Sequence, residues 1–552
     1  MRIFLVVLGL AATSTTSGAQ AIRCDTLHSE VTLGPLSGER IDSVAVETAA
    51  PRLGKLARAI GRLHVRTRAN VVQRELLFAV GDTVDTLLVA ESLRRLRALP
   101  IFERAQIQAR RCTVGATQSL ALSVLTRDSW TSRPDLKAGS SSSRVGLTER
   151  NLFGTGRTMS LDLVSHNGSI GGGTTVLDDF GFGTGVTTRA QYQRYADGSI
   201  RGVLLSHRAA TLSDPWRASL DVSDQRYEPR GTLTDNFERT SAELLAGVRL
   251  TRRRAAHAIY ALGGLASEYG SLVAAPNAEI VGPTRVDRHF TGPEIGAAIV
   301  ATRYDTLTWL FDNGSVVDVP RGFEGELVIG IGRGTVNASE MGSPVPDVAR
   351  PNFMTHYDAW LGREWLPDRR SRIVSDVWFA GYSRAGDWRS SHMRAAISAE
   401  HAASNGIWRL TGASEQLNDP DPDVRALAMY DRALGFVPKR ARLAESAFAL
   451  SVERTRHLHA VGSALEIDGS MFGALSKRWD PSPGASAQED LSVGLVGVGL
   501  SVAPRRSGRA TIRLDYGLPV IGSAGISRSP RLNITLLPWL EAGRRRDKSG
   551  SF

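Results

Sequence analysis

The chain has 552 residues, which is enough for roughly two to four ordinary domains. Its hydrophobic content of 42% and mean hydropathy of -0.14 suit a soluble protein and a transmembrane β-barrel alike, because the lumen face of a barrel is polar. The net charge is +11, but basic residues such as Arg189 and Arg513 alternate with apolar ones. This spread is typical of a charged lumen or of a surface facing lipopolysaccharide, and it argues against a compact nucleic-acid patch.

Residues 1–21 have the pattern of a secretory signal peptide. Arg2 precedes an apolar segment at 3–12, and Ala19-Gln20-Ala21 is an A-x-A-type cleavage site. Cys24 has no Leu three positions before it, which argues against a lipoprotein start. No later stretch holds about 18 consecutive apolar residues, so we expect no transmembrane helix. These features predict export to the periplasm, the extracellular space or a membrane barrel.

An irregular lead-in at 22–38 precedes a small α+β domain at 39–128. Val71, Val72 and Leu76 recur at helical spacing, and Gly81-Asp82 ends that pattern. The expected elements, in chain order, are a strand at 41–46, helices at 68–80 and 85–99, and strands at 101–110 and 118–126.

The two cysteines, Cys24 and Cys112, lie on either side of this domain. In an oxidising compartment a disulfide between them would close the domain, and two free thiols are the alternative.

After a polar linker at 129–137, the hydrophobic period changes to two. For example, Met159, Leu161 and Leu163 alternate with polar residues, and Gly, Asn, Asp and Pro clusters separate such runs. The alternation continues across 138–540 without a long helical segment, and a basic tail follows at 541–552. At roughly 25 residues per strand and turn, this region predicts about 16 antiparallel strands.

Stacked β-sandwiches would also alternate, whereas a propeller would show repeats of about 40–50 residues, which are not evident. The signal peptide, the 55 glycines and the unbroken length favour a membrane barrel.

Most of the amino-terminal domain, residues 39–127, resembles a single POTRA domain. The resemblance rests on Arg74-Glu75-Leu76-Leu77, Gly81-Asp82, Leu93-Arg94-Arg95-Leu96 and Ile101-Phe102.

Two later segments resemble the BamA/TamA-type outer-membrane barrels, the bacterial surface antigen family. The run from Asn151 through Phe153, Gly154 and Gly156 is similar to the start of the barrel, at its first hairpin. The run Arg513-Leu514-Asp515-Tyr516-Gly517-Leu518-Pro519 is similar to the penultimate strand. The implied fold is an α+β POTRA domain followed by an all-β transmembrane barrel.

The same resemblance implies an Arg-Gly-Phe/Tyr loop folded into the lumen. Its place is filled by Arg432-Ala433-Leu434-Gly435-Phe436, in which Leu434 replaces the arginine while Gly435 and Phe436 fit. Arg432 could supply the missing cation, and so could Arg440 or Arg442. A literal Arg321-Gly322-Phe323 is the second candidate, although it lies nearer the middle of the barrel region.

Acidic partners for such an arginine follow from strand parity. If Phe448, Leu450 and Val452 face lipid, Glu453 faces the lumen. By the same rule, Asp468 faces the lumen together with Glu466. We therefore expect Arg432 or a neighbouring cation to pair with Glu453 or Asp468. A generic lumen ion pair is the alternative.

Signals for catalysis are weak. His457 and His459 are the one close histidine pair, and neither a P-loop nor a G-x-S-x-G motif is present. We therefore expect a protein that is not an enzyme and that needs no cofactor and no metal.

The family resemblance implies insertion of proteins into the outer membrane of a Gram-negative-type cell, or polypeptide translocation across it, with the POTRA domain in the periplasm. The implied partners are lipid and lipopolysaccharide, unfolded outer-membrane or secreted polypeptides, and periplasmic or lipoprotein subunits. Alternatives are an outer-membrane channel or porin for solutes, a structural or adhesive surface protein and, more remotely, a secreted enzyme.

Overall fold

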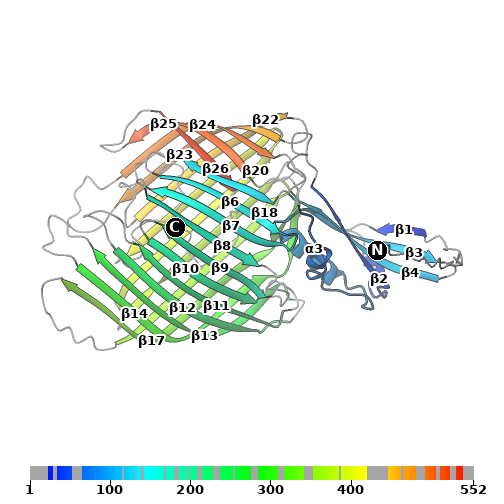
Figure 1. Ribbon diagram of the computed structural model, residues 1–552, viewed down its shortest axis with the longest axis horizontal. Helices are drawn as coiled ribbons and strands as arrows, with labels where there is room; N and C mark the ends of the chain where they lie inside the picture. The colour runs from blue at the N-terminus through cyan, green and yellow to red at the C-terminus, as the bar shows by residue number, and fades with distance from the viewer. Residues whose placement is uncertain are drawn as a thin grey trace, which may run out of the picture.

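The computed structural model describes an amino-terminal domain attached to one end of a large β-barrel (Figure 1). The signal peptide expected at 1–21, the basic tail expected at 541–552 and the 432–436 segment lie outside the described residues. The described residues are 23–28, 34–51, 65–114, 117–129, 131–138, 142–166, 169–178, 186–195, 198–207, 214–227, 236–252, 255–274, 284–308, 316–340, 352–384, 387–418, 446–461, 465–479, 491–504, 510–522 and 530–538.

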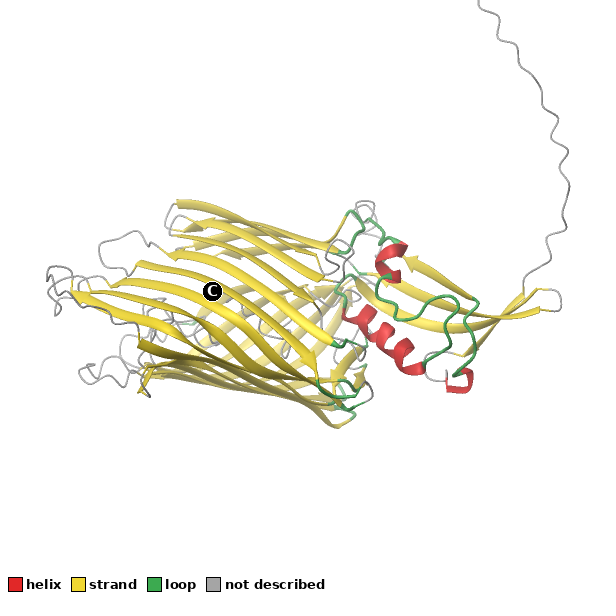
Figure 2. Ribbon diagram, turned by 90° about the horizontal axis from the view of Figure 1, so that it is seen from below, coloured by secondary structure: helices red, strands yellow, loops and turns green. Residues whose placement is uncertain are grey.

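The amino-terminal domain has a four-stranded sheet in the order β1-β3-β4-β2, in which β2 runs parallel to β4 and the other pairs are antiparallel. Figure 2 shows its helices in red alongside the sheet, with the longest of them reaching the end of the barrel. The elements are β1 (Arg23–His28), η1 (Gly34–Leu36), β2 (Ser43–Ala49), α2 (Ala69–Gln73), α3 (Thr86–Ala98), β3 (Phe102–Val114) and β4 (Thr117–Asp128).

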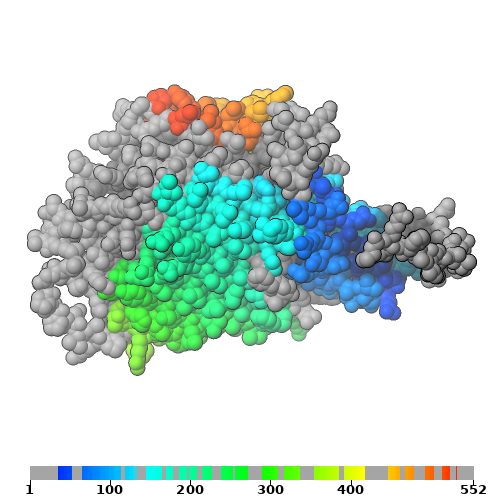
Figure 3. All heavy atoms as spheres, viewed as in Figure 1, coloured from blue at the N-terminus to red at the C-terminus, as the bar shows by residue number. Residues whose placement is uncertain are grey.

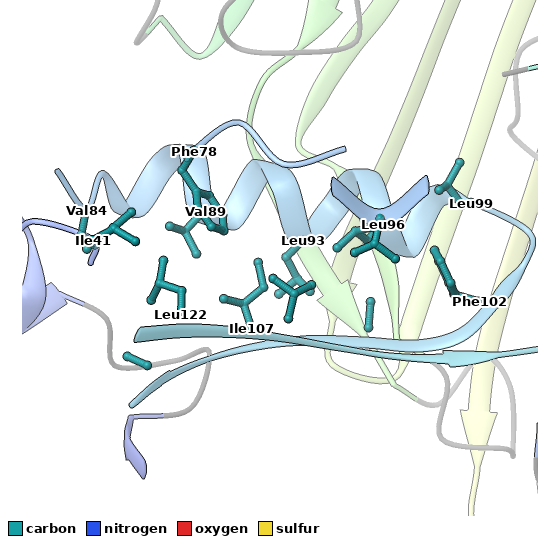
Figure 4. Close-up of a cluster of buried hydrophobic side chains, with 14 of the residues drawn as sticks. Ile41, Phe78, Val84, Val89, Leu93, Leu96, Leu99, Phe102, Ile107 and Leu122 are labelled. Atoms are coloured by element: carbon teal, nitrogen blue, oxygen red, sulfur yellow. The ribbon is translucent and has the colours of Figure 1, made fainter. Parts of the chain in front are cut away.

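Helix α3 supplies the centre of the domain core. Asp85 caps it by accepting a hydrogen bond from the Leu87 N–H at 2.9 Å. Val89, Leu93 and Leu96 follow at helical spacing and are buried against the sheet (Figure 4). The predicted helix at 85–99 is therefore confirmed.

The helix expected at 68–80 was wrong over most of its length, because α2 ends at Gln73. The following residues form turns held by two side chains. The Leu77 N–H donates to Ser92 Oγ at 2.8 Å, and the Ala79 N–H donates to Asp82 Oδ2 at 2.8 Å. These turns bring Phe78 into the core, where it is 7% exposed. Burial of this aromatic ring competes with helix continuation.

The lead-in at 22–38 is less irregular than predicted, since it contains the edge strand β1. This strand pairs with β3, and Cys24 lies directly opposite Cys112 in the register. Cys112 is disulfide-bonded. The sequence of β1 lacks apolar alternation, so it gives no local signal for a strand. Its extended conformation depends on the pairing with β3.

The barrel is one large antiparallel sheet whose strand order runs from β5 to β26 and brings β26 next to β5. A small hairpin, β15 (Tyr304–Leu307) with β16 (Val317–Pro320), lies between β14 and β17. The barrel strands are β5 (Ser132–Ala138), β6 (Ser142–Leu152), β7 (Arg157–His166), β8 (Ser169–Asp178), β9 (Val186–Tyr195), β10 (Gly198–His207), β11 (Trp216–Tyr227), β12 (Asn236–Arg249), β13 (His257–Ala274), β14 (Thr284–Ala301), β17 (Gly322–Glu340), β18 (Asn352–Asp368), β19 (Ser371–Arg384), β20 (Asp387–Ala403), β21 (Gly406–Asn418), β22 (Ser446–Val461), β23 (Leu465–Trp479), β24 (Leu491–Pro504), β25 (Ala510–Gly522) and β26 (Arg531–Pro538).

The prediction of about 16 strands was too low, because the barrel order contains twenty strands in the described residues. Strands β5 to β11 have only 7 to 12 residues, and several neighbours among them are separated by only two to four residues in the sequence. The linker expected at 129–137 was also wrong over most of its length, since β5 begins at Ser132. Within the described part of the chain, no helix has the length and apolar character needed to cross a bilayer.

Side chains alternate between the two faces of the barrel wall, as the period of two predicts. On β22, Phe448, Leu450 and Val452 are 38%, 40% and 45% exposed, whereas Glu453 is 6% exposed. We call the first face outward and the second inward. The outward face is apolar over most of its height, and the inward face carries charges.

Reduction of the disulfide is expected to destabilise the amino-terminal domain. On the chain-entropy model, closing a loop of roughly 88 residues corresponds to about 4 to 5 kcal/mol. Urea unfolding of the full chain, followed by proteolysis of the domain with and without reductant, measures this difference. A Cys24→Ser variant should match the reduced protein, and labelling of two thiols in unreduced protein would contradict the prediction.

Candidate functional site

A buried ion cluster lies on the inward face of β22 to β25, centred on Arg513. Its Nη2 lies 2.7 Å from Glu453 Oε1 and donates to Ser470 Oγ at 2.8 Å. Its Nε lies 2.7 and 2.9 Å from the two carboxylate oxygens of Asp515. Side chains of β22, β23 and β25 therefore meet at a single guanidinium, that of Arg513, which is 8% exposed.

The wall around this cluster is shaped to hold it. The Phe472 ring lies 6.0 Å from Arg513 Cζ. Gly499 faces the cluster from β24, and a Cβ at that position would collide with Asp515 Oδ1 and lie 2.5 Å from Ser470 Oγ. A side chain at 499 would thus occupy the space in which the ion pair forms. Because buried charges require close partners, this packing explains why glycine is suited to the site.

A second group of inward charges continues around the wall from β18 to β21. Arg372 contacts Glu364 and lies 3.2 Å from Glu400 Oε2, and Arg409 Nε donates to Glu400 Oε1 at 2.8 Å. Arg409 is directly opposite Glu453 in the β21–β22 register. We call the residues of both groups the charge belt; they are Glu364, Arg372, Glu400, Arg409, Glu453, Arg513 and Asp515.

Glu453 is 6% exposed and lies on the face opposite to Phe448, Leu450 and Val452, and in the described residues its cation comes from the barrel wall. Asp468 lies 3.1 Å from His457 Nδ1. Because Arg432, Leu434, Gly435 and Phe436 lie outside the described residues, their pairing with these carboxylates stays a prediction. The alternation Arg513-Leu514-Asp515 places both charges on one face, and this signal could have indicated the cluster.

The alternative motif at Arg321 is not in a lumen loop. Arg321 precedes β17 at the domain side of the barrel, where it is 67% exposed and lies 3.2 Å from Asp305 Oδ2. Phe323 then points outward and is 40% exposed. The local sequence fits the family pattern, but its place between the hairpin and β17 gives it a different environment.

The amino-terminal domain is attached to the barrel through Asn151, at the turn between β6 and β7. Its Nδ2 donates to the Val65 carbonyl at 3.2 Å and to Thr67 Oγ1 at 2.9 Å. Its Oδ1 accepts from the Gly156 N–H at 2.9 Å. This single amide, 2% exposed, therefore shapes the turn and binds the segment before α2.

Backbone contacts complete this attachment. The Arg68 N–H donates to the Gly154 carbonyl at 3.0 Å, and the Thr67 N–H donates to Asp128 Oδ2 at 2.9 Å. Gly154 has φ +73, and a Cβ there would lie 2.5 Å from the Arg66 carbonyl oxygen. Figure 3 shows the blue surface of the domain running directly into the cyan surface of the first barrel strands.

The expected barrel-start motif is thus placed differently from its prediction. Asn151, Phe153, Gly154 and Gly156 form the turn between the second and third barrel strands, not the first hairpin. The prediction missed β5, which carries little apolar alternation. Phe153 has φ 54 and is 68% exposed beside the attachment.

A second attachment joins α3 to the β15–β16 hairpin. Arg97 Nη1 lies 3.4 Å from Asp318 Oδ1, and Arg94 Cζ lies 4.5 Å from the centre of the Tyr304 ring. Val319 of the hairpin is 1% exposed. Burial raises the pKa of Asp318, and the positive charges of Arg97 and Arg94 oppose that rise.

The two attachments are far apart on the barrel rim. In the order of twenty strands, the first lies between strands two and three and the second between strands ten and eleven. The domain therefore lies across the mouth of the barrel. Figure 2 shows the helices at that end.

The described residues contain no group of three His, Cys, Asp or Glu side chains placed to hold a metal ion. The charge belt consists of ion pairs in which each carboxylate contacts a guanidinium. This arrangement can order the wall and present a polar inner surface.

Comparison with known proteins finds similar barrels among solved structures. No protein-family model and no curated protein sequence matches the chain. BamA from Haemophilus ducreyi lacking POTRA domains 1–3 has a TM-score of 0.38 and 11% identity, covering 94% of this chain and 90% of that one. CdiB from Acinetobacter baumannii has a TM-score of 0.37 and 9% identity, covering 90% and 74%. CdiB from Escherichia coli has a TM-score of 0.37 and 11% identity, covering 93% and 80%. The TM-scores and the sequence identities are both low, so the proposals below rest on this chain's own residues.

Substitutions in the Arg513 cluster should differ in cost according to the charge they leave behind. Arg513→Gln leaves Glu453 and Asp515 buried without their shared cation, and we expect a loss of about 3 kcal/mol. Glu453→Gln leaves Arg513 paired with Asp515, and we expect a loss of about 1 kcal/mol. The gel shift between folded and heat-denatured barrel gives the urea concentration at the midpoint of unfolding, and this midpoint measures both losses of stability. Arg456→Gln, at an exposed residue of β22, is the control. A larger loss for Glu453→Gln than for Arg513→Gln would contradict this order.

Gly154→Ala is expected to loosen the domain from the barrel, because the added Cβ collides with the Arg66 carbonyl. Gly38→Ala is the matched control, since Gly38 also has a positive φ, +90, but open space around its Cβ position. The distribution of distances between spin labels on α3 and on the barrel should broaden for Gly154→Ala only. Equal broadening in both variants would assign the effect to backbone strain.

Proposed function

We propose that this chain is an outer-membrane barrel with one periplasmic POTRA-type domain, and that it assists insertion of polypeptides into the membrane or their translocation across it. The observation that carries the proposal is the position of the barrel seam, by which we mean the meeting of β26 and β5. The seam is one strand away from β6, whose turn to β7 forms the first attachment of the domain.

The seam is formed by the two shortest strands of the barrel. In the described residues β5 has seven residues and β26 has eight, whereas the other barrel strands have 10 to 19. Fewer residues form fewer ladder hydrogen bonds, so this junction should open at lower free energy than the rest of the wall. An opened seam offers two unpaired strand edges, and such edges recruit further strands.

The domain offers a strand edge of its own. In the described part of the sheet, β2 is the terminal strand and pairs with β4 on one side. An extended polypeptide could add to its other side by β-augmentation. We therefore propose unfolded outer-membrane or secreted polypeptides as clients, with periplasmic or lipoprotein subunits as further partners.

The barrel wall supports the proposed membrane location. Its outward face is apolar over most of its height, and in lipid every strand must be hydrogen-bonded within the protein. The end that carries the domain would face the periplasm, and the opposite end would face lipopolysaccharide.

A solute channel is the second candidate, because the lumen widens with strand number and twenty strands make a wide barrel. The charge belt would then line the pore. Stable single-channel conductance together with an unchanged outer-membrane proteome after depletion would favour this alternative.

Cross-linking the seam should abolish the proposed activity. A disulfide between β5 and β26 can be engineered from a scan of paired cysteines. We expect this disulfide to stop client insertion in reconstituted vesicles, and we expect its reduction to restore insertion. The matched control is Ala261→Cys with Ala297→Cys, two outward residues directly opposite each other on β13 and β14. That pair fixes the wall but not the seam. Full activity with an oxidised seam would overturn the proposal.

A further inference from the structure

The outward face of the barrel carries arginines stacked on aromatic rings at the domain side. Arg363 of β18 lies near two rings, with its Cζ 4.8 Å from the centre of Phe323 and 5.2 Å from that of Trp365. Arg454 of β22 lies over Trp408 at 5.1 Å. These contacts hold the planar guanidinium groups against the wall by cation–π attraction.

Both guanidinium groups face solvent. Arg363 and Arg454 are exposed, and Trp408 is 43% exposed. Arg454 Nη2 donates to Asn405 Oδ1 at 3.2 Å. Among the described residues, neither arginine has a carboxylate partner, so their charge and most of their donors are free to meet an external anion.

The two arginines lie at the boundary between the apolar band and the turns of the domain side. The next outward positions toward the middle of the wall are apolar: Leu361 beside Arg363, Leu410 beside Trp408 and Val452 beside Arg454. They are 50%, 46% and 45% exposed. Aromatic residues at such a boundary lie at the depth of the lipid headgroups.

The opposite end of the outward face differs in charge. There Arg226 Nη2 lies 2.9 Å from Glu238 Oε1, and Arg201 Nε lies 3.8 Å from Asp224 Oδ2. Those arginines are neutralised by carboxylates of the chain. The domain-side arginines lack such partners, so an anion from outside the chain would complete their environment.

We propose that Arg363 with Phe323 and Trp365, and Arg454 with Trp408, bind the phosphate groups of anionic phospholipids in the leaflet next to the domain. A guanidinium recognises phosphate with paired, charge-assisted hydrogen bonds, and the flanking rings contact the glycerol and upper acyl region. The proposal rests on the membrane location proposed above and does not depend on the insertion activity.

The test uses the full chain reconstituted in bilayers of phosphatidylcholine containing a minority of phosphatidylglycerol. Native mass spectrometry after release counts the phosphatidylglycerol retained per protein. Since a basic residue near an anionic surface contributes about a fivefold preference, Arg363→Gln with Arg454→Gln should lower the enrichment by roughly tenfold or more. Arg201→Gln with Arg226→Gln, at the opposite end, is the matched control and should retain the wild-type enrichment.

Each outcome separates the hypotheses. Equal enrichment in all three proteins would overturn the lipid site. Displacement of the bound lipid by soluble glycerol phosphate at millimolar concentration would assign the site to free phosphate compounds and overturn the commitment to lipid. Failure of the wild-type chain to float with the vesicles would overturn both the membrane location and this inference. Absence of client insertion by the wild-type chain, with its phosphatidylglycerol enrichment retained, would count against the proposed function alone.

Discussion

The constraint on which the rest of the structure depends is the hydrogen-bonding of the strand backbone. A strand that crosses lipid finds no water for its N–H and C=O groups, so each strand must pair on both sides. In the membrane location proposed above, the barrel strands of the described residues meet this requirement, because each is hydrogen-bonded to its neighbours in the barrel order. The alternation of side chains then follows from the pleat, which puts apolar residues outward and polar residues inward. Within the described barrel strands, the seam is where pairing joins the first strand, β5, to the last strand, β26.

The charge belt is a consequence of the same alternation. Inward residues of a barrel wall are partly desolvated, and a lone carboxylate there would be costly. Arg513 reduces that cost because it contacts Glu453 and Asp515 together, while Gly499 leaves the space that the contact needs. The belt thereby links β22 to β25, the strands that lead to the seam. It can stiffen this part of the wall while β26, beyond it, remains the weakly held edge.

Local sequence predicts those features that depend on local spacing. The cap at Asp85 and the helical period of α3 could be predicted from the sequence, because they depend on residues within two helical turns. The face on which Glu453 lies could be predicted as well, because it depends on one strand alone. The end of α2 at Gln73 was not readable, since burial of Phe78 against distant strands decides it. Likewise, the pairing of Glu453 with Arg513 requires the registers of three strand pairs. Strand β1 was missed because its partner, not its own composition, determines its conformation.

The position of the domain bears on how a polypeptide would leave the barrel. One attachment, at Asn151, is two strands from the seam, and the other, at Asp318, is near the opposite side of the rim. A domain held at both points lies across the mouth and hinders straight passage through the lumen. A displacement of the domain about the Asp318 contact would act on the β6–β7 turn, and through it on β5. For the function proposed above, this geometry would favour lateral release through the seam over axial conduction, with the amino-terminal domain as the element that would bias its opening.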